Sequence, residues 1–244
     1  MDLIKLKQFI SSHALTKKLA EPLLNSYVRL RYVKSRSYTK DHEDRAVLGL
    51  LKKRFGLAPS EVRYFDIGAN HYLRGSNSYL AYRCGATGVL VEADPMLCEQ
   101  LKKHRPKDTV MNNAITDQAG SGDLSFFVCS LATRSTLDPV QAERLKRHGF
   151  TIEREIAVPA LTFEEIVEQC GFVPDFLSID VEGYDLRVLK SIDLEKFPVK
   201  VILAETDAGM DEYMHECGYR RIWQYSSNTL FCRKQNKTAD GGKP

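Results

Sequence analysis

Carboxylates follow apolar, strand-like runs at three places in the chain. The first run ends in the turn DIGAN at residues 66–70, the second in VEAD at 91–94, and the third in DVEG at 180–183. In open α/β folds, ligands bind beyond the carboxyl ends of the parallel strands, at the point where the strand order reverses. We therefore expect the three acidic segments to meet at one site.

The turn after the first run indicates which ligand this site would take. Only Gly68 occupies the turn, whereas a dinucleotide fold requires G-x-G-x-x-G, whose amides hold a pyrophosphate at a helix start. Asp66 would repel a pyrophosphate but suits a cationic sulfonium and an amino group. Glu92, about 25 positions after the turn, can accept from both hydroxyls of a ribose. These features favour S-adenosylmethionine (SAM) over a nicotinamide cofactor; the alternative is a tight βα turn with a solvated acid.

Three side chains are candidates for a general base. Methyl transfer from a sulfonium is an in-line displacement, and a hydroxyl becomes a good nucleophile only as its proton is removed. The candidates are Asp180, Glu182 and His71. Asp180 alternatively binds only the cofactor's amino group, or shares a divalent ion with Glu205, although two oxygen ligands do not define a metal site. For His71, a hydrogen bond to the loop backbone is the favoured interpretation.

Short apolar runs alternate with helical stretches from Glu61 onward, which is typical of a parallel sheet covered by helices on both faces. Strands are expected at 62–68, 88–94, 109–115, 176–183 and 200–205, with a terminal pair at 219–224 and 228–234. Helices are expected near 76–82, 95–103, 139–148 and 162–170. The segment 124–160 interrupts this rhythm, and we expect it to be an insertion that forms a substrate wall. Within it, Arg134 and Ser135 either contact the substrate or, as we favour, belong to a solvated loop.

The chain divides into a basic leader and a net acidic body. Residues 1–40 carry a net charge of +7 and the remaining residues −4. We expect a helical extension over 1–58, the main domain over 59–233 and a flexible tail over 234–244. Apolar residues at helical spacing indicate leader helices near 3–10, 19–28 and 41–55. These helices either pack on the domain, which we favour, or lie on an anionic membrane surface.

The composition is typical of a globular chain that needs neither metal nor disulfides to fold. Of its 244 residues, 43% are hydrophobic and 27% charged, and no window approaches about 18 consecutive apolar residues, which argues against a membrane span. The start lacks the features of a signal peptide, and the six cysteines show no C-x-x-C spacing. We expect buried free thiols in a cytoplasmic protein. Trp223 and Tyr225 are expected to pack against the sheet, and the oligomeric state is left open.

Three stretches resemble the FkbM-type SAM-dependent methyltransferases: DIGANHYLRGSNSYLAYRCGATGVLVEADP, RPKDTVMNNAIT and FLSIDVEGYDLRVLKSIDLEKFPVKVILAET. The similarity runs from about Asp41 to Glu205, and DVEGY after the fourth strand is its most specific part. It implies a class I SAM-methyltransferase fold, a Rossmann-like α/β sandwich with a mostly parallel seven-stranded sheet. It also implies O-methylation of a hydroxyl, commonly on a sugar or a natural product. Asp185 stands where the family usually has Glu, which puts only the local packing in doubt.

The resemblance also assigns roles around the cofactor by position. Residues after the first strand would line its methionine part, and those after the second and third strands would hold its ribose and adenine. Asp180 and Glu182 would sit below the transferred methyl group. The residues assigned to cofactor binding are Asp66, Gly68, Ala69, Asn70, Glu92, Ala93, Asp94, Asn113, Ala114 and Asp180.

Together these observations predict a SAM-dependent O-methyltransferase with a small-molecule or glycan acceptor. The alternatives are a methyltransferase acting on RNA or protein, and a catalytically silent SAM-fold module that binds a partner. Nucleic acid is not expected, because the basic run at 102–107 lies at a helix end and the body is net acidic. The (D/N)PP(Y/F) tetrapeptide of many base-amino methyltransferases is also absent.

Overall fold

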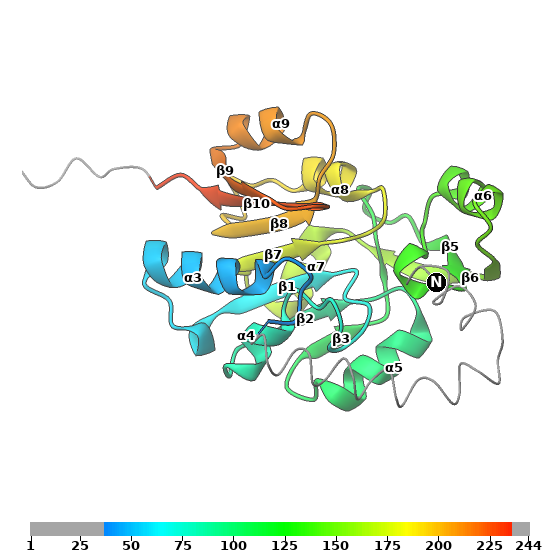
Figure 1. The fold of residues 1–244 in the computed structure, drawn as a ribbon, viewed down its shortest axis with the longest axis horizontal. Helices are drawn as coiled ribbons and strands as arrows, with labels where there is room; N and C mark the ends of the chain where they lie inside the picture. The colour runs from blue at the N-terminus through cyan, green and yellow to red at the C-terminus, as the bar shows by residue number, and fades with distance from the viewer. Residues whose placement is uncertain (1–36, 236–244) are drawn as a thin grey trace, which may run out of the picture.

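A mostly parallel sheet lies at the centre of the fold (Figure 1). The structure, a computed structural model, describes residues 37–235. The strands of this sheet are β1 (Arg63–Ile67), β2 (Thr87–Val91), β3 (Thr109–Met111), β7 (Phe176–Ile179), β8 (Val201–Glu205), β9 (Tyr219–Gln224) and β10 (Asn228–Arg233). They are arranged in the order β3-β2-β1-β7-β8-β10-β9, and β10 is antiparallel to both of its neighbours. The seven-stranded sheet expected from the sequence is thereby confirmed.

The strand order reverses between β1 and β7. The chain passes outward from β1 to β2 and β3, and later returns to place β7 on the other side of β1. The connections that follow β1 and β7 therefore lead to opposite sides and leave a space between them at the carboxyl ends of these two strands. This is the position at which open α/β sheets form a crevice for a ligand.

Helices cover both faces of the sheet (Figure 1). They are α3 (Glu43–Phe55), α4 (Tyr79–Arg83), α5 (Pro95–His104), α7 (Phe163–Cys170), α8 (Asp185–Ser191) and α9 (Met210–Glu216), whereas α6 (Pro139–Arg147) lies beside β6. Successive strand residues alternate between two cores. Tyr64 and Leu90 pack with α3, α4 and α5, whereas Phe65 and Val89 pack with α7, α8 and α9. Both faces of the central strands are thus buried, as their continuous apolar runs predict.

The prediction of one strand at 109–115 is wrong, because this segment forms two short strands. β3 ends at Met111, and β4 (Ala114–Ile115) belongs to a separate three-stranded sheet with β5 (Asp123–Cys129) and β6 (Ile152–Leu161). The chain breaks at Asn112, whose side-chain amide donates to the backbone carbonyls of Glu92 and Ala93 at 3.0 Å each. Amide side chains compete with strand pairing in this way, so an apolar run containing two asparagines can change sheets.

The segment expected as an insertion forms a long β-hairpin with a helix in its loop. β5 pairs with β6 in antiparallel register, and between them lie the short helix η2 (Ala132–Arg134) and α6. Asp138 caps α6 by accepting a hydrogen bond from the backbone of Val140. Thr136 forms an isolated antiparallel bridge with Phe127 of β5, which folds the loop back onto the hairpin.

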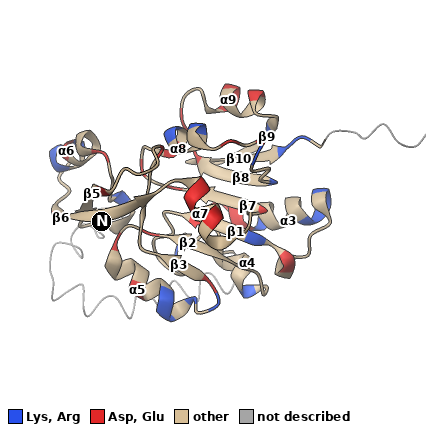
Figure 2. Ribbon diagram, turned by 180° about the vertical axis from the view of Figure 1, so that it is seen from behind, with Lys and Arg blue, Asp and Glu red and all other residues tan. Residues whose placement is uncertain are grey.

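Most predicted helices are present, and the sequence analysis did not predict α9. The helix expected at 76–82 starts later, at Tyr79, and η1 (Pro59–Glu61) precedes β1. The predicted helices near 3–10 and 19–28, and the tail beyond residue 235, lie outside the described residues. Basic residues occupy the last turns of α3, α5 and α6, where their charges complement the helix dipoles (Figure 2).

Within residues 37–235, no helix is long and apolar enough to cross a membrane. All six cysteines are free thiols. Cys98, Cys129 and Cys232 are buried, but Cys84 is exposed, so the expectation of buried thiols is wrong for that residue. Trp223 is also exposed, at 62% of its surface, so its predicted packing against the sheet is wrong; it lies on the edge strand β9 instead.

Candidate functional site

A cavity of about 190 Å³ opens at the carboxyl ends of β1, β2 and β7, where the strand order reverses. Ala132, Thr133, Ser135 and Leu137 from the hairpin loop close one side of it. Nearly all the sequence-predicted site residues line this cavity. They are Asp66, Gly68, Ala69, Asn70, Glu92, Ala93, Asn113, Ala114, Asp180 and Glu182. His71, Asp94 and Glu205 do not line it.

The turn after β1 is built tightly against its neighbours. Gly68 has a φ of +78°, and the amides of Gly68 and Ala69 donate to the carbonyl of Val91 at 2.9 and 3.1 Å. A Cβ atom at Gly68 would collide with the backbone carbonyl of Asp180. Asn70 also has a positive φ of +50°, and it completes the turn into the loop that follows. Glycine is therefore required here by both conformation and space.

Glu92 stands at the end of β2 with its carboxylate held by the backbone. One oxygen accepts from the amide of Asn70 at 2.7 Å and the other from the amide of Asp94 at 2.8 Å. Burial raises its pKa to about 7, and the two amides oppose that shift by favouring the charged form. An oriented carboxylate of this kind retains lone pairs for a further donor, such as a diol.

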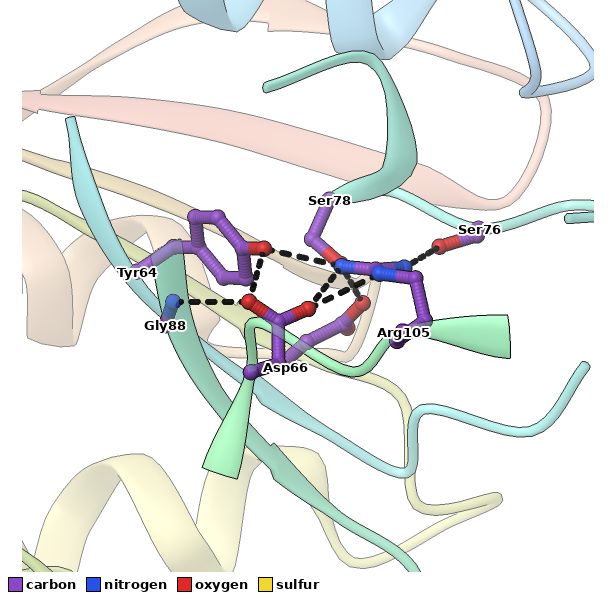
Figure 3. A network of polar contacts seen from close by, with 7 residues as sticks. Tyr64, Asp66, Ser76, Ser78, Gly88 and Arg105 are labelled. Carbon is purple, nitrogen blue, oxygen red and sulfur yellow. Dashed lines mark hydrogen bonds and ion pairs between the residues drawn. The ribbon is translucent and has the colours of Figure 1, made fainter. Parts of the chain in front are cut away.

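Asp66 lies at the cavity wall but belongs mainly to a polar network behind it (Figure 3). Only 3% of its surface is exposed, and the Ser78 hydroxyl donates to its carboxylate at 2.5 Å. Burial raises the pKa of Asp66, while Ser78 and the nearby Arg105 guanidinium act in the opposite direction. Ser78 was not predicted from the sequence, and Arg105 was placed only in a basic run at a helix end. The network shows instead that both lie behind the site.

Asp180 and Glu182 bring two acids to the same end of the cavity. Asp180 is open to the cavity but otherwise surrounded by protein, and this burial, with Glu205 and Asp66 nearby, raises its pKa to about 6. Burial and the charges of Asp180 and Glu205 raise the pKa of Glu182 to about 8. The Arg134 guanidinium opposes both shifts. Such upward shifts poise a carboxyl group for proton transfer near neutral pH.

The backbone around Glu182 is specifically supported. Glu182 has a left-handed φ of +49°, which is uncommon for a residue with a side chain. The Thr136 hydroxyl, from the hairpin loop, donates to the Glu182 carbonyl at 3.2 Å. Asp185, buried at the start of α8, accepts from the amides of Val181 at 3.4 Å and Glu205 at 3.2 Å. The side chain of Asp185, although shorter than the Glu usual at this position in the resembled family, therefore still joins the ends of β7 and β8.

The described residues show no metal centre. Asp180 and Glu205 end neighbouring strands, and Glu205 contributes to the raised pKa of Asp180. Nevertheless, no group of three or more His, Cys, Asp or Glu side chains within residues 37–235 is placed to hold an ion. The donor set thus does not fit a metal site.

His71 turns away from the cavity. Its Nδ1 atom accepts from the amides of Leu73 and Arg74 at 3.0 Å each, and its ring stacks on Tyr72 with centroids 4.5 Å apart. Burial lowers the pKa of His71 to about 3, so the ring is neutral. This geometry corresponds to the hydrogen-bonded loop histidine that the sequence analysis favoured.

The remaining candidates have structural partners. Asp94 caps α5 through the amide of Met96, at 2.8 Å, and lies 3.6 Å from the guanidinium of Arg154. Asn113 lines the cavity and donates to the carbonyl of Pro159 at 3.1 Å. Ser135 also lines the cavity, with its hydroxyl accepting from the Cys129 amide, whereas Arg134 is exposed at its rim.

Comparisons with known proteins found one matching family model and similar solved structures. The family model described as the methyltransferase FkbM domain matches residues 66–221. A solved TehB-like SAM-dependent methyltransferase from Corynebacterium glutamicum ATCC 13032 Kitasato is 12% identical, with a TM-score of 0.39, over 86% of this chain and 97% of that one. A SAM-dependent methyltransferase from Agrobacterium tumefaciens is 13% identical, with a TM-score of 0.36, over 78% of this chain and 61% of that one. No curated protein matches the sequence.

Proposed function

This chain belongs to the methyltransferase FkbM domain family, and from that premise we propose that it transfers a methyl group from SAM to a hydroxyl of a saccharide or related small metabolite. The observation that carries the proposal is the convergence of Asp66, Gly68, Glu92 and Asp180 on one cavity at the reversal of strand order. This is where an α/β fold of this kind binds its ligand.

The residues around the cavity suit the charges and hydrogen-bonding groups of SAM. The close approach of the Gly68 turn to Asp180 leaves the cavity wall free of a Cβ atom at that point. Glu92 offers an oriented carboxylate suited to two ribose hydroxyls. Asp66 and Asp180 place negative charge at the wall, which favours a sulfonium and an amino group over a pyrophosphate. We propose that Asn113 and Ala114 lie beside the adenine.

The reaction assigns different tasks to the residues of this chain. SAM, when bound, supplies an electrophilic methyl group on a sulfonium. We propose that Glu182 removes the acceptor hydroxyl proton as the oxygen attacks, because its pKa of about 8 suits a base at neutral pH. Asp180, with its lower pKa of about 6, stays ionised and balances the cofactor's positive charge. The hairpin loop from Ala132 to Leu137 excludes water and positions the acceptor.

The acceptor class comes from the family resemblance and agrees with the charges at the cavity. Glu182 and Asp180 line the cavity and are hydrogen-bond acceptors that can orient a polyhydroxylated molecule. Their negative charge disfavours RNA, whose phosphates need a basic surface. We propose that the protein acts in the cytoplasm, because its cysteines are free thiols and a reducing compartment keeps thiols in that state.

Calorimetric titration with S-adenosylhomocysteine (SAH), the demethylated product of SAM, tests the cofactor class, with NAD as the control. We expect saturable SAH binding, no NAD binding and no effect of Mg²⁺. Asp66→Ala and Glu92→Ala should each weaken SAH binding, and unchanged affinity in both would contradict the site. Transfer of isotope-labelled methyl from SAM to a panel of saccharides then tests the acceptor. SAH binding without transfer to any acceptor would support the silent partner-binding module instead.

A further inference from the structure

Arg105 is the largest side chain that is fully buried in the described part of the molecule. It follows α5 as its C-terminal cap, yet none of its surface is exposed. Its guanidinium pairs with Asp108 at 2.8 Å and donates to the Tyr64 hydroxyl at 2.9 Å. It also lies 4.6 Å from the centroid of the Tyr82 ring. The arginine therefore points inward beneath the site, although it belongs to a basic run at a helix end.

The same guanidinium reaches two serines of the loop that leads from the Gly68 turn into α4 (Figure 3). It donates to Ser78 Oγ at 3.1 Å and to Ser76 Oγ at 3.4 Å. Ser76 and its neighbours Arg74, Gly75 and Asn77 line the cavity, whereas Arg105 itself does not. The arginine thus contacts the back of a cavity wall.

The contacts at Ser78 fix the direction of its hydroxyl. A serine has a single proton to donate, and a guanidinium can only donate. Because Arg105 donates to Ser78 Oγ, the Ser78 proton must point elsewhere, and it points to Asp66 Oδ2 at 2.5 Å. These two hydrogen bonds form a relay with one direction: Arg105 donates to Ser78, and Ser78 donates to Asp66.

The cluster also carries an excess of negative charge. Arg105 contributes one positive charge, while Asp108 and Asp66 contribute two negative ones when ionised. Asp108 is paired directly with the guanidinium, whereas the hydrogen-bond path from the guanidinium to Asp66 passes through Ser78. The unpaired charge thus lies on the side that faces the cavity. A cationic ligand would balance it there.

We propose that Arg105 is a positioning residue for the cofactor-binding wall: it holds Ser76 and Ser78 from behind and, through Ser78, orients the Asp66 carboxylate for a cationic ligand. This inference rests on the proposed function in that the cation is taken to be SAM. Neither Arg105 nor Ser78 needs to touch the ligand for this role. A buried ion pair such as Arg105–Asp108 often adds little to the free energy of unfolding, because removing two charges from water is costly. Its contribution here is therefore the position that it gives to the guanidinium.

The decisive comparison is between Ser78→Ala and Tyr64→Phe. Each removes one hydroxyl that accepts from Arg105, but only Ser78 leads on to Asp66. We expect Ser78→Ala to weaken SAH and SAM binding by about tenfold or more, since a hydrogen bond to a charged group is lost. Tyr64→Phe should change affinity by less than about twofold, although its loss of thermal stability should be similar to that of Ser78→Ala. Equal affinities in both variants would overturn the proposal.

A double-mutant cycle extends the test to Arg105 itself. Arg105→Lys keeps the charge but cannot reach Asp108, Ser76 and Ser78 together. If the relay is real, Arg105→Lys combined with Ser78→Ala weakens binding no more than the stronger single variant. Additive losses would overturn the relay. If Arg105→Lys does not fold, the same cycle is run with Ser78→Ala and Asp66→Asn.

Hydrogen exchange separates failure of this inference from failure of the proposed function. In the absence of any ligand, Ser78→Ala should speed amide exchange at Gly75–Asn77, and Tyr64→Phe should not. If the unmodified protein binds neither SAH nor SAM, the proposed cofactor is wrong, while this exchange difference still supports the positioning role. If the protein binds SAH but neither exchange nor affinity changes in Ser78→Ala, the positioning role is wrong and the proposed function stands.

Discussion

Gly68 and Asp180 are in backbone contact across the site, because a Cβ atom on Gly68 would overlap the carbonyl oxygen of Asp180. The Asp180 amide also donates to the carbonyl of Ile67 at 3.0 Å. The turn proposed to bind the cofactor and the loop that carries the candidate base thus form a single unit. Movement of either one changes the geometry of the other.

Alanine at position 68 should abolish SAH binding in a protein that still folds. The alanine must either push the Asp180 backbone out of the cavity wall or distort its own turn, where φ is +78°. Calorimetric titration measures the loss. Gly149→Ala is the matched control, because its φ is +83° but no described atom lies within 4 Å of the added Cβ. It should lose roughly 1–2 kcal/mol of stability and keep its affinity, and normal SAH binding by Gly68→Ala would contradict the contact.

Glu182→Gln should lower turnover by about 10²–10⁴-fold and leave SAH affinity unchanged. The pH dependence of the rate identifies the base, because the pKa is raised to about 8 at Glu182 and to about 6 at Asp180. A rate that rises until about pH 8 assigns the base to Glu182, and one that levels off near pH 6 assigns it to Asp180. A flat profile across this range would argue against both residues.

The ligand-free protein should lose stability as the pH rises from about 6.5 to about 8.5. Burial raises the pKa values of Glu182 and Asp185 to about 8 and that of Glu92 to about 7. The folded state therefore holds protons that the unfolded state has already released, so rising pH favours unfolding until these groups also ionise in the folded state, where the loss levels off. His71, whose pKa is lowered, acts in the opposite direction only below about pH 6.5.

Thermal unfolding across this range measures the effect. Asp185→Asn should flatten the slope, since the amide does not titrate. Asp175→Asn is a control at the other end of β7, where the carboxylate pairs with Lys200. Stability that is constant or rising over the range would show that the buried acids ionise without penalty.

The sequence predicts the sheet and most of the cavity wall because both depend on local patterns. Continuous apolar runs mark β1, β2, β7 and β8, and acids that directly follow such runs must lie at the carboxyl edge. The single glycine of the first turn likewise indicates close approach of backbones. Residues such as Gly68, Glu92 and Asp180 can therefore be placed without a structure.

Other features depend on contacts that no local pattern records. Arg105 lies in a basic run typical of a solvated helix end, but its partners Ser76, Ser78 and Tyr64 are 29, 27 and 41 positions away. His71 follows the glycine turn as a ligand-facing residue would, yet two amides of its own loop hold its ring. Burial and side-chain direction at these positions arise only from the tertiary fold.

Thr136 provides the last prediction, because it joins the hairpin loop to the candidate base. Its buried hydroxyl donates to the Glu182 carbonyl at 3.2 Å, next to a backbone held at a φ of +49°. Thr136→Val keeps the shape but removes the donor, so stability should fall by about 1 kcal/mol. Turnover should fall by about tenfold as Glu182 shifts. SAH affinity should not change, because Thr136 does not line the cavity.

Thr136→Ser is the matched control, since it retains the hydroxyl and removes only a methyl group. It should recover most of the turnover lost in Thr136→Val when methyl transfer and SAH binding are measured side by side. Normal turnover in Thr136→Val would show that the hairpin does not position Glu182. Equal losses in both variants would show that the hydrogen bond does not account for the effect, because the serine still offers its proton to the Glu182 carbonyl.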